Sequence, residues 1–388
     1  MSRLILVLNV ARLHHLCDRI FWIYGHDAVA RHLIPYRDYH PEYPPLAAVL
    51  FMIPGAARDW LAYATWFAGM MLTVDLLTVV LVRHAAEGLM PCTDGWRAAF
   101  SYTALSFATT AVLNKFDVLP GMLTLVAVLG LASRREQMAW IALAAAVLLK
   151  GYALVLAPLF LLYRYRVHGG ARWWRGPVAG ALFTGVILLP VLVVGRRGLV
   201  ASLFYHAHRG LEIESIYASV ILVAHHIWPL HVTVTGGAAV RSRDVFSSLN
   251  GTLHVVAPLA LAAGLAVAYV VAWVRLRRDP APTALLVLSM AVVTAFMMTF
   301  KALPTHYLLW VAPMVAVTLG RPVSETGRAA IAFCIAVGLG IVILSVWLPL
   351  RHLDSFATAV MVSRNIAILA AFVLLLRAAW PSHAACTL

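Results

Sequence analysis

The chain alternates between long apolar runs and short polar breaks. Of its 388 residues, 62% are hydrophobic and 12% are charged, and the mean hydropathy is +0.86. A soluble fold cannot bury that much apolar surface, and many runs approach the roughly 20 residues that cross a bilayer as a helix. We therefore predict an all-α polytopic membrane protein with about 10–12 transmembrane helices.

The predicted membrane segments follow one another closely. The strong apolar runs cover residues 61–82, 98–113, 117–132, 138–149, 151–163, 176–195, 254–274, 282–300, 303–319, 328–349 and 364–380, and weaker runs cover 4–17 and 215–230. The two runs within 138–163 are short for full crossings, so they form either one long helix or a re-entrant pair. No polar stretch is long enough for a soluble domain, and residues 1–388 are expected to form one integral-membrane domain.

The distribution of arginine predicts the orientation of these segments. The net charge is +14, and arginines are dense in the loops at 134–135, 164–175 and 275–278. Basic loops stay on the cytoplasmic side of a plasma membrane, where they face anionic lipid, so the charge does not indicate nucleic-acid binding. Alternating the spans then places the long connections at 18–60 and 196–250 on the extracytoplasmic side.

The three lysines of the chain lie in three polar breaks between apolar runs. These breaks are Asn-Lys-Phe-Asp at 114–117, Lys-Gly-Tyr at 150–152, and Lys-Ala-Leu-Pro-Thr-His-Tyr at 301–307. The predicted topology places all three breaks on the extracytoplasmic side. A lysine at the rim of a membrane span is a hydrated point charge that binds phosphate well. We therefore expect a cationic site on that face.

The first extracytoplasmic connection is rich in alternating acidic and aromatic residues. It contains Tyr-Arg-Asp-Tyr at 36–39 and Glu-Tyr-Pro-Pro at 42–45. Carboxylates hold sugar hydroxyls and aromatic rings cover the apolar faces of sugars, so the pattern suits a carbohydrate site. A solvated loop anchored by interfacial aromatic residues is the alternative. Because proline is tolerated in the first helical turn, the two prolines predict the start of a helix.

Four motifs together resemble those of a known enzyme family. The segment Tyr36-Arg37-Asp38-Tyr39 followed by Glu42-Tyr43-Pro44-Pro45 is similar to a signature of actinobacterial membrane glycosyltransferases. The segments NKFDVLP at 114–120, RGLEIES at 209–215 and KALPTHYLLWVAP at 301–313 resemble further motifs of the same proteins. These belong to the C-type superfamily, close to glycosyltransferase family 87, the polyprenyl-phosphate-mannose-dependent mannosyltransferases.

This resemblance implies a reaction and a set of site residues. It implies transfer of a sugar, most readily mannose, from a polyprenyl phosphate to an envelope glycolipid or polysaccharide, with inversion. No cofactor is expected, and no metal site is expected because no cysteine or acid completes a zinc ligand set with His225, His226 and His231. Asp18 would be the general base. The departing phosphate gains charge and needs cations, and the candidates are Lys115, Arg209, Lys301 and His306. The candidates for holding the sugar or acceptor are Tyr36, Arg37, Asp38, Glu42, Tyr43, Asp117, Glu212 and Glu214.

Other interpretations of the same residues remain open. The acids can instead form structural ion pairs, Asp117 with Lys115 and Glu214 with Arg209. The mid-span Asp75 is either functional or part of a buried pair that joins helices. A transporter or a flippase for lipid-linked sugars is the alternative function. A transporter usually has interrupted helices in two related halves, whereas here the polar residues gather at one predicted face, which favours the enzyme.

Overall fold

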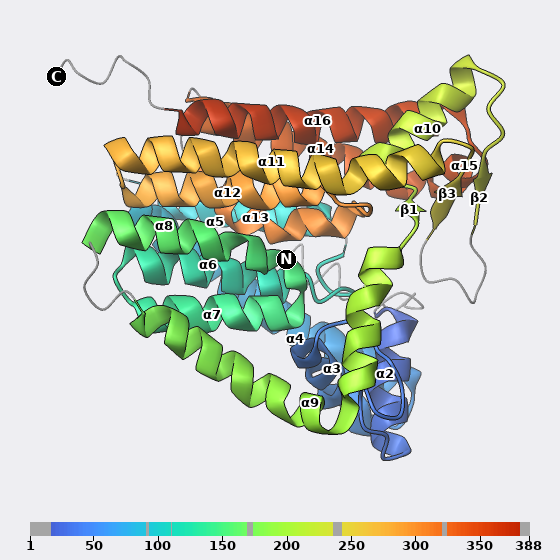
Figure 1. Ribbon diagram of the computed structural model, residues 1–388, viewed down its shortest axis with the longest axis horizontal. Helices are drawn as coiled ribbons and strands as arrows, with labels where there is room; N and C mark the ends of the chain where they lie inside the picture. Colours follow the sequence, from blue (N-terminus) through green and yellow to red (C-terminus); the bar gives the residue numbers. More distant parts are fainter. Residues whose placement is uncertain are drawn as a thin grey trace. The chain divides into compact units, whose positions relative to one another are not determined.

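The computed structural model describes residues 17–90, 93–109, 111–168, 174–235, 243–319 and 324–380. These residues are mainly helical and include one small sheet (Figure 1). Among them, six helical segments are long and apolar enough to cross a membrane: Trp60–Leu89, Arg175–Tyr205, Asn250–Arg278, Pro282–Thr299, Glu325–Ser345 and Ser355–Ala379. Shorter apolar helices cover Pro45–Ala56, Val118–Ala132, Glu136–Leu149 and Ile216–Ile227. The prediction of an all-α polytopic membrane protein is confirmed. The weak run predicted at 4–17 lies outside the described residues, apart from Cys17.

The helices pack into two compact units, each built from three stretches of chain. The first unit comprises Met1–Leu81, Thr110–Leu154 and Arg172–His208, and the second comprises Val82–Thr109, Val155–Ala171 and Arg209–Leu388. The long helix α4 (Trp60–Leu89) runs from the first unit into the second. That the whole chain acts as one integral-membrane domain stays a prediction.

The first unit is built around an aromatic core beneath the start of helix α2. Its elements besides the first part of α4 are α2 (Arg19–Ala30), α3 (Pro45–Met52), the 3₁₀ helix η2 (Ile53–Ala56), α6 (Val118–Ala132), α7 (Glu136–Leu149) and α9 (Arg175–His208). The ring of Phe21 on α2 stacks on Phe51 with centroids 4.4 Å apart, and Phe116 meets it edge-on at 5.6 Å. The hydroxyl of Tyr63 lies 2.7 and 2.8 Å from the carbonyl oxygens of Phe21 and Phe51. This core holds α2, α3 and α4 together and so determines where Asp18 lies.

The acidic and aromatic connection between α2 and α3 folds back on this unit. Tyr36 adopts the left-handed conformation with φ 68°, and its buried hydroxyl donates to the carbonyl oxygen of Tyr43 at 2.6 Å. A β-carbon at Gly198 of α9 would lie 2.0 Å from the carbonyl oxygen of Tyr36, so glycine is needed for that close approach. Pro45 begins α3, as the two prolines predicted. The connection is therefore a packed part of the scaffold.

The polar break at Lys150 separates two helices. The residues Arg134 and Arg135 form the turn between α6 and α7. At the other end of α7, Lys150 is extended, with φ −158° and ψ 108°, and the chain continues as the 3₁₀ helix η3 (Gly151–Leu156) and then α8 (Ala157–His168). Of the two alternatives for residues 138–163, one continuous long helix is excluded.

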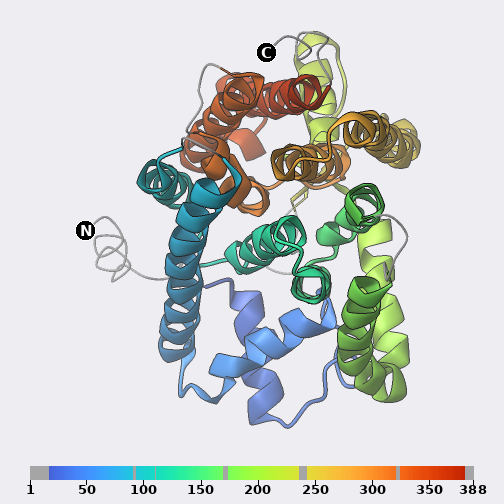
Figure 2. The same cartoon turned by 90° about the vertical axis from the view of Figure 1, so that its left-hand side faces the viewer.

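The second unit surrounds the buried helix α12. It contains part of α4, α8, α5 (Gly95–Ala108), α10 (Ile216–Ile227), α11 (Asn250–Arg278), α12 (Pro282–Thr299), the 3₁₀ helix η4 (Thr305–Trp310), α13 (Ala312–Thr318), α14 (Glu325–Ser345), α15 (Trp347–Arg351) and α16 (Ser355–Ala379). Helix α12 contacts both α11 and α16, and Figure 2 shows α14 and α16 (orange to red) side by side. A small antiparallel sheet has the order β1 (Leu211–Glu212), β3 (Asp244–Phe246) and β2 (Thr233–Val234), with Leu211 opposite Val245.

A glycine in α2 provides a test of the first unit. A β-carbon at Gly25 would lie 2.0 Å from the carbonyl oxygen of Phe51 and 2.7 Å from the hydroxyl oxygen of Tyr63. Because overpacking a tight core costs roughly 1–3 kcal/mol or more, we expect Gly25→Ala to lower the thermal unfolding midpoint in detergent. Gly69→Ala is the matched control, since nothing lies within 4 Å of its β-carbon position. Equal midpoints for the two variants would contradict the close packing of α2.

Candidate functional site

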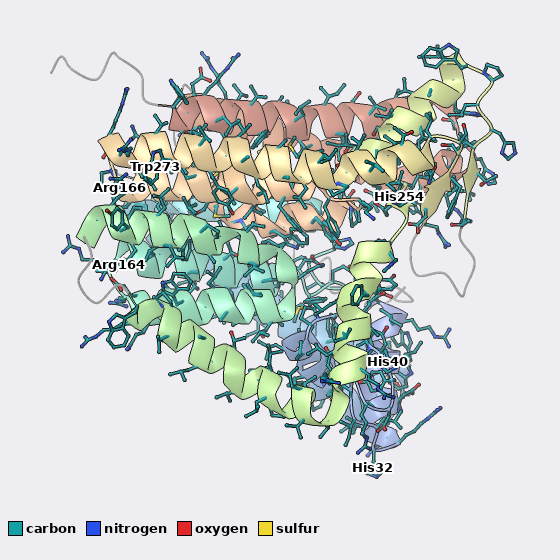
Figure 3. All side chains as sticks on the ribbon, viewed as in Figure 1. His32, His40, Arg164, Arg166, His254 and Trp273 are labelled. Carbon is teal, nitrogen blue, oxygen red and sulfur yellow. The ribbon has the colours of Figure 1, made fainter. Side chains whose placement is uncertain are left out.

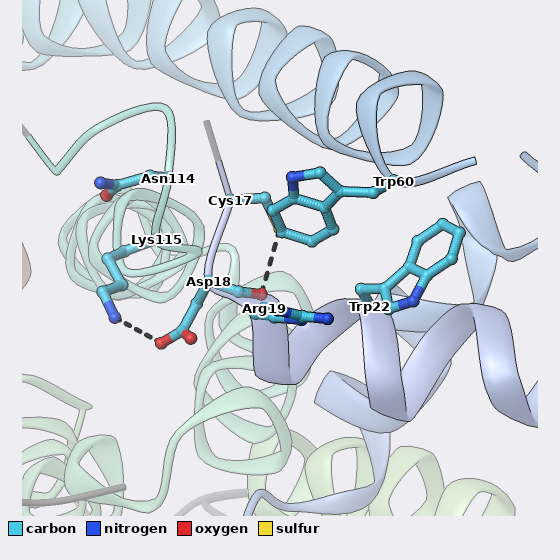
Figure 4. A pocket seen from close by; sticks show the side chains of 7 residues that line it. All are labelled: Cys17, Asp18, Arg19, Trp22, Trp60, Asn114 and Lys115. Atoms are coloured by element: carbon cyan, nitrogen blue, oxygen red, sulfur yellow. Dashed lines mark hydrogen bonds and ion pairs between the residues drawn. The ribbon is translucent and has the colours of Figure 1, made fainter. Parts of the chain in front are cut away.

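A cavity of about 770 Å³ lies in the first unit, at the start of helix α2. Its lining comes from Cys17, Asp18, Arg19, Trp22, Trp60, Asn114 and Lys115 (Figure 4). Asp18 caps the helix, and its Oδ1 accepts a hydrogen bond from the backbone N–H of Ile20 at 3.3 Å. The cap fixes the backbone of Asp18, and the side chain faces the cavity. The residue that was expected to be the catalytic base therefore lines this cavity.

The carboxylate of Asp18 lies beside one of the three lysines. Lys115 Nζ donates to Asp18 Oδ2 at 2.6 Å, and the two side chains are 26% and 33% exposed respectively. Arg19, the next residue along the chain, is exposed and forms no ion pair with any described residue. The side-chain oxygen of Asn114 is buried and has no hydrogen-bond partner among the described residues. The cavity thus combines an accessible carboxylate, two cations and an unused acceptor.

A second lysine, Lys150, forms an ion pair with a buried carboxylate of the first unit. Lys150 Nζ donates to Asp117 Oδ1, and the Asp117 side chain is only 1% exposed. This pairing joins the break at 114–117 to the break at 150–152. The ion pair suggested for Asp117 with Lys115 is therefore wrong, because Lys115 pairs with Asp18 and Asp117 pairs with Lys150. Asp117 is placed to hold the two breaks together.

The residues 36–43 do not line the cavity beside Asp18. The ring of Tyr43 meets those of Phe21 and Phe116 edge-on at 5.9 and 5.4 Å, inside the aromatic core. Asp38 accepts from the backbone N–H of Ile34 at 2.7 Å and pairs with Arg37 at 2.8 Å. The hydrogen bond from Arg37 lowers the pKa of Asp38. Glu42 is half-buried. The aromatic rings that do line the cavity are those of Trp22 and Trp60, which the sequence analysis did not select.

The second unit brings the two remaining motifs together. The backbone N–H of Glu212 donates to the carbonyl oxygen of Lys301 at 3.0 Å, and Glu212 Oε2 accepts from the backbone N–H of Leu303 at 3.2 Å. Lys301 Nζ lies 3.3 Å from the carbonyl oxygen of Arg209 and 3.4 Å from His254 Nδ1. The segments 209–215 and 301–305, which are far apart in the sequence, therefore form one structure.

Burial shifts the pKa values of Glu212 and Lys301 in this structure. Burial and, to a smaller extent, the nearby carboxylate of Glu214 together raise the pKa of Glu212 to about 8. Burial also lowers the pKa of Lys301. A raised carboxyl pKa favours the neutral acid and a lowered ammonium pKa favours the neutral amine, so both groups are held where charge is costly.

Glu214 is held by a residue of helix α16 that the sequence analysis missed. Its Oε2 accepts from the backbone N–H and the hydroxyl of Thr305 at 3.0 and 2.8 Å, and it lies 3.3 Å from Arg364 Nη1. Arg364 is fully buried and also donates to the carbonyl oxygens of Leu303 and Glu214 at 2.8 and 2.6 Å. The suggested pairing of Glu214 with Arg209 is therefore replaced by one with Arg364. A charged residue inside an apolar helix was the available signal.

The four candidates for binding the phosphate are divided between the two units. Lys115 lies in the first unit, and Arg209, Lys301 and His306 lie in the second. His306 lies on η4, five residues after Lys301, and its ring meets that of Tyr307 edge-on at 5.1 Å. That all four approach one phosphate stays a prediction. No group of three or more potential metal ligands occurs among the described residues.

Comparison with known families decides the class of protein. The sequence model of glycosyltransferase family 87 matches residues 40–300, which is more than half of the chain. The chain belongs to glycosyltransferase family 87. It is therefore a membrane glycosyltransferase, as the four motifs indicated, while no curated protein matches it. The matched residues include Lys115, Arg209 and Glu214. Asp18 and Lys301 lie outside the match, so their roles rest on the geometry.

The Glu214–Arg364 pair makes a specific prediction about stability. Removing one partner of a buried ion pair strands the other charge and costs roughly 3–5 kcal/mol. We therefore expect Arg364→Met to lower the unfolding midpoint strongly. Arg328→Gln breaks an exposed pair with Glu325 and should cost at most about 1 kcal/mol. Thermal unfolding of both variants in the same detergent tests this, and similar midpoints would show that Arg364 is not a structural clamp.

Proposed function

We propose that this glycosyltransferase moves a sugar from a polyprenyl-phosphate donor to a glycolipid or polysaccharide acceptor at the outer face of the plasma membrane. Mannose is the favoured sugar, on the resemblance of its motifs. The observation that carries the proposal is the Asp18 carboxylate, paired with Lys115 in a cavity that also contains Arg19. Such a site provides an acceptor for a proton beside cations for a leaving phosphate.

The proposed reaction is a single displacement at the anomeric carbon. The acceptor hydroxyl oxygen forms a bond to that carbon while its proton passes to Asp18. The bond from the carbon to the phosphate oxygen breaks, and the electron pair leaves with the polyprenyl phosphate. Lys115 and Arg19 are placed to stabilise the charge that develops on the phosphate. Arg19 thus joins the phosphate candidates, and Trp22 and Trp60 take the sugar-covering role first assigned to Tyr36 and Tyr43.

Glu212, Glu214 and Asp117 then act as supports. Glu214 is bonded to Thr305 and Arg364, and Asp117 is paired with Lys150 inside the first unit. We assign these carboxylates to holding the lysine-bearing breaks in place. Lys301 remains a phosphate candidate: it is a cation in the break at 301–307, and its Nζ lies near the carbonyl oxygen of Arg209 and the ring of His254. Asp38 and Glu42 remain candidates for contacts with the acceptor.

The geometry within each unit supports the outer-face location. In the second unit, Trp273 and Arg277 lie at the opposite end of α11 from His254, the neighbour of Lys301 (Figure 3). About 23 residues at roughly 1.5 Å each separate His254 from Arg277, or about 35 Å, which is close to a bilayer core. In the first unit, the 134–135 turn and Lys115 flank opposite ends of α6. The basic loops and the lysines thus lie at opposite ends of the helices, as the positive-inside rule requires.

The assignment of the base is tested by Asp18→Asn. Loss of a general base typically lowers the rate about 10²- to 10⁴-fold, so we expect that loss while thermal unfolding stays normal. The assay incubates purified enzyme with a panel of polyprenyl-phosphate sugars and follows donor consumption by mass spectrometry, which also identifies the sugar. Asp38→Asn is the control from the neighbouring connection. Near-normal turnover by Asp18→Asn beside an inactive Asp38→Asn would move the base to Asp38.

The phosphate role of Lys301 is tested by a donor titration. A charge-assisted hydrogen bond is worth about 1.5–3 kcal/mol, so Lys301→Gln should weaken donor use roughly 10- to 150-fold. Arg83→Gln is the matched control, because Arg83 already pairs with Glu87 at 3.1 Å. Its donor use should stay almost unchanged. Equal losses in the two variants, at matched expression, would mean that folding and not phosphate binding explains Lys301.

A further inference from the structure

Two arginines cluster against one tryptophan at the end of helix α11 that is opposite His254 and Lys301. The guanidinium carbon of Arg166 on α8 lies 4.6 Å from the ring centroid of Trp273, and that of Arg277 lies 5.0 Å from the same centroid. Arg278 follows directly and is exposed. Figure 3 labels Arg166 and Trp273 at this end of the second unit. Cations gather over the ring because its face is electronegative.

The cluster carries more positive charge than its neighbours balance. Asp279 is the acid at this end of α11, and it pairs with Arg275 at 2.6 Å. Arg166, Arg277 and Arg278 form no ion pair with any residue in the described ranges. The Nε atom of Arg166 is buried and has no hydrogen-bond partner there. Two like charges over one ring repel each other, so an anion between them would stabilise the arrangement.

A second arginine–tryptophan contact in the same unit includes a carboxylate, which the contact at Trp273 lacks among the described residues. The guanidinium carbon of Arg83 lies 4.2 Å from the ring centroid of Trp96. There, Glu87 provides a carboxylate at 3.1 Å from Arg83 Nε. The contact at Trp273 has two guanidinium groups and no such carboxylate among the described residues. An anionic ligand would therefore find two guanidinium groups there that no described carboxylate neutralises.

The position of the cluster identifies the class of that molecule. Trp273 is 43% exposed at the end of a candidate membrane span, where tryptophan lies at the level of lipid headgroups. Val270 and Val267 on α11 are 58% and 48% exposed, and Leu161 on α8 is 40% exposed. These apolar side chains lie along the helices below the arginines and fit an acyl chain. An arginine fork binds phosphate in a bidentate manner.

We propose that Arg166, Trp273 and Arg277 form a headgroup site for an anionic phospholipid of the cytoplasmic leaflet. The guanidinium groups bind the lipid phosphate, and the exposed apolar residues of α8 and α11 contact its acyl chain. The site is separate from the Asp18 cavity and does not depend on the sugar-transfer reaction. Bound lipid would brace α8 against α11 at the end opposite Lys301.

Native mass spectrometry of the detergent-purified protein tests the proposal. Phosphatidylglycerol and phosphatidylcholine are titrated separately, and the bound fraction is measured for each variant. Each basic residue near a membrane surface contributes about 1 kcal/mol to binding anionic lipid, so Arg166→Gln with Arg277→Gln should weaken phosphatidylglycerol binding about 30-fold. Wild-type protein should bind phosphatidylcholine much more weakly. Arg83→Gln, which removes the neutralised contact, should bind phosphatidylglycerol like the wild type.

The proposal would be overturned by equal binding of the two lipids by wild-type protein, or by equal losses in Arg83→Gln and in the double variant. Displacement of phosphatidylglycerol from this site by polyprenyl phosphate would also overturn it. That displacement would assign the site to the donor lipid. Arg277→Gln alone guards against misfolding of the double variant, because Arg277 is exposed. This variant should lose about fivefold in affinity, and unchanged binding would also overturn the proposal.

Discussion

Every break in an apolar helix of this protein must satisfy the polar groups that the break leaves behind. Water is scarce within a bilayer, so irregular backbone and charge are tolerated there only when protein groups or a cavity satisfy them. The structure meets this constraint with ion pairs: Asp18 with Lys115, Asp117 with Lys150, and Glu214 with Arg364. Each pair joins two segments that are distant in the sequence. The positions of the functional loops therefore depend on these pairs.

The three ion pairs differ mainly in burial. Burial distinguishes the pairs suited to a structural role from the pair that a substrate can reach. Asp117 and Arg364 are almost fully buried, and the side chains of their partners Lys150 and Glu214 are only 13% and 7% exposed. Asp18 is one-third exposed and lines a cavity. A carboxylate that is to receive a proton must be reachable by the acceptor hydroxyl. Of the paired carboxylates, Asp18 meets this requirement.

Hydrophobic pattern predicted the helices well because membrane burial acts on whole segments. The run at 282–300 corresponds closely to α12, and the run at 138–149 to α7. The run predicted at 364–380 is shorter than α16, which begins at Ser355 and carries Arg364 and Asn365 in its interior. Arg364 is the residue that holds Glu214. Its partner Glu214 lies 150 positions earlier, and no local pattern contains a pairing of that range. The same limit explains why Trp22 and Trp60 were missed and why Lys115 was first paired with Asp117.

The choice of lysine at the breaks and arginine elsewhere has a physical reason. Arginine presents a planar fork that suits fixed, multiple contacts, as Arg364 shows with two carbonyl oxygens and a carboxylate. Lysine is a compact charge on a flexible stem. At Lys150 that compact charge fits beside one buried carboxylate. At Lys115 the ammonium pairs with Asp18, and in the proposed reaction the same flexibility would let it turn toward the donor phosphate. If Asp18 is the base that we propose, an arginine at 115 would hold its carboxylate with two hydrogen bonds and compete with the proton that it accepts.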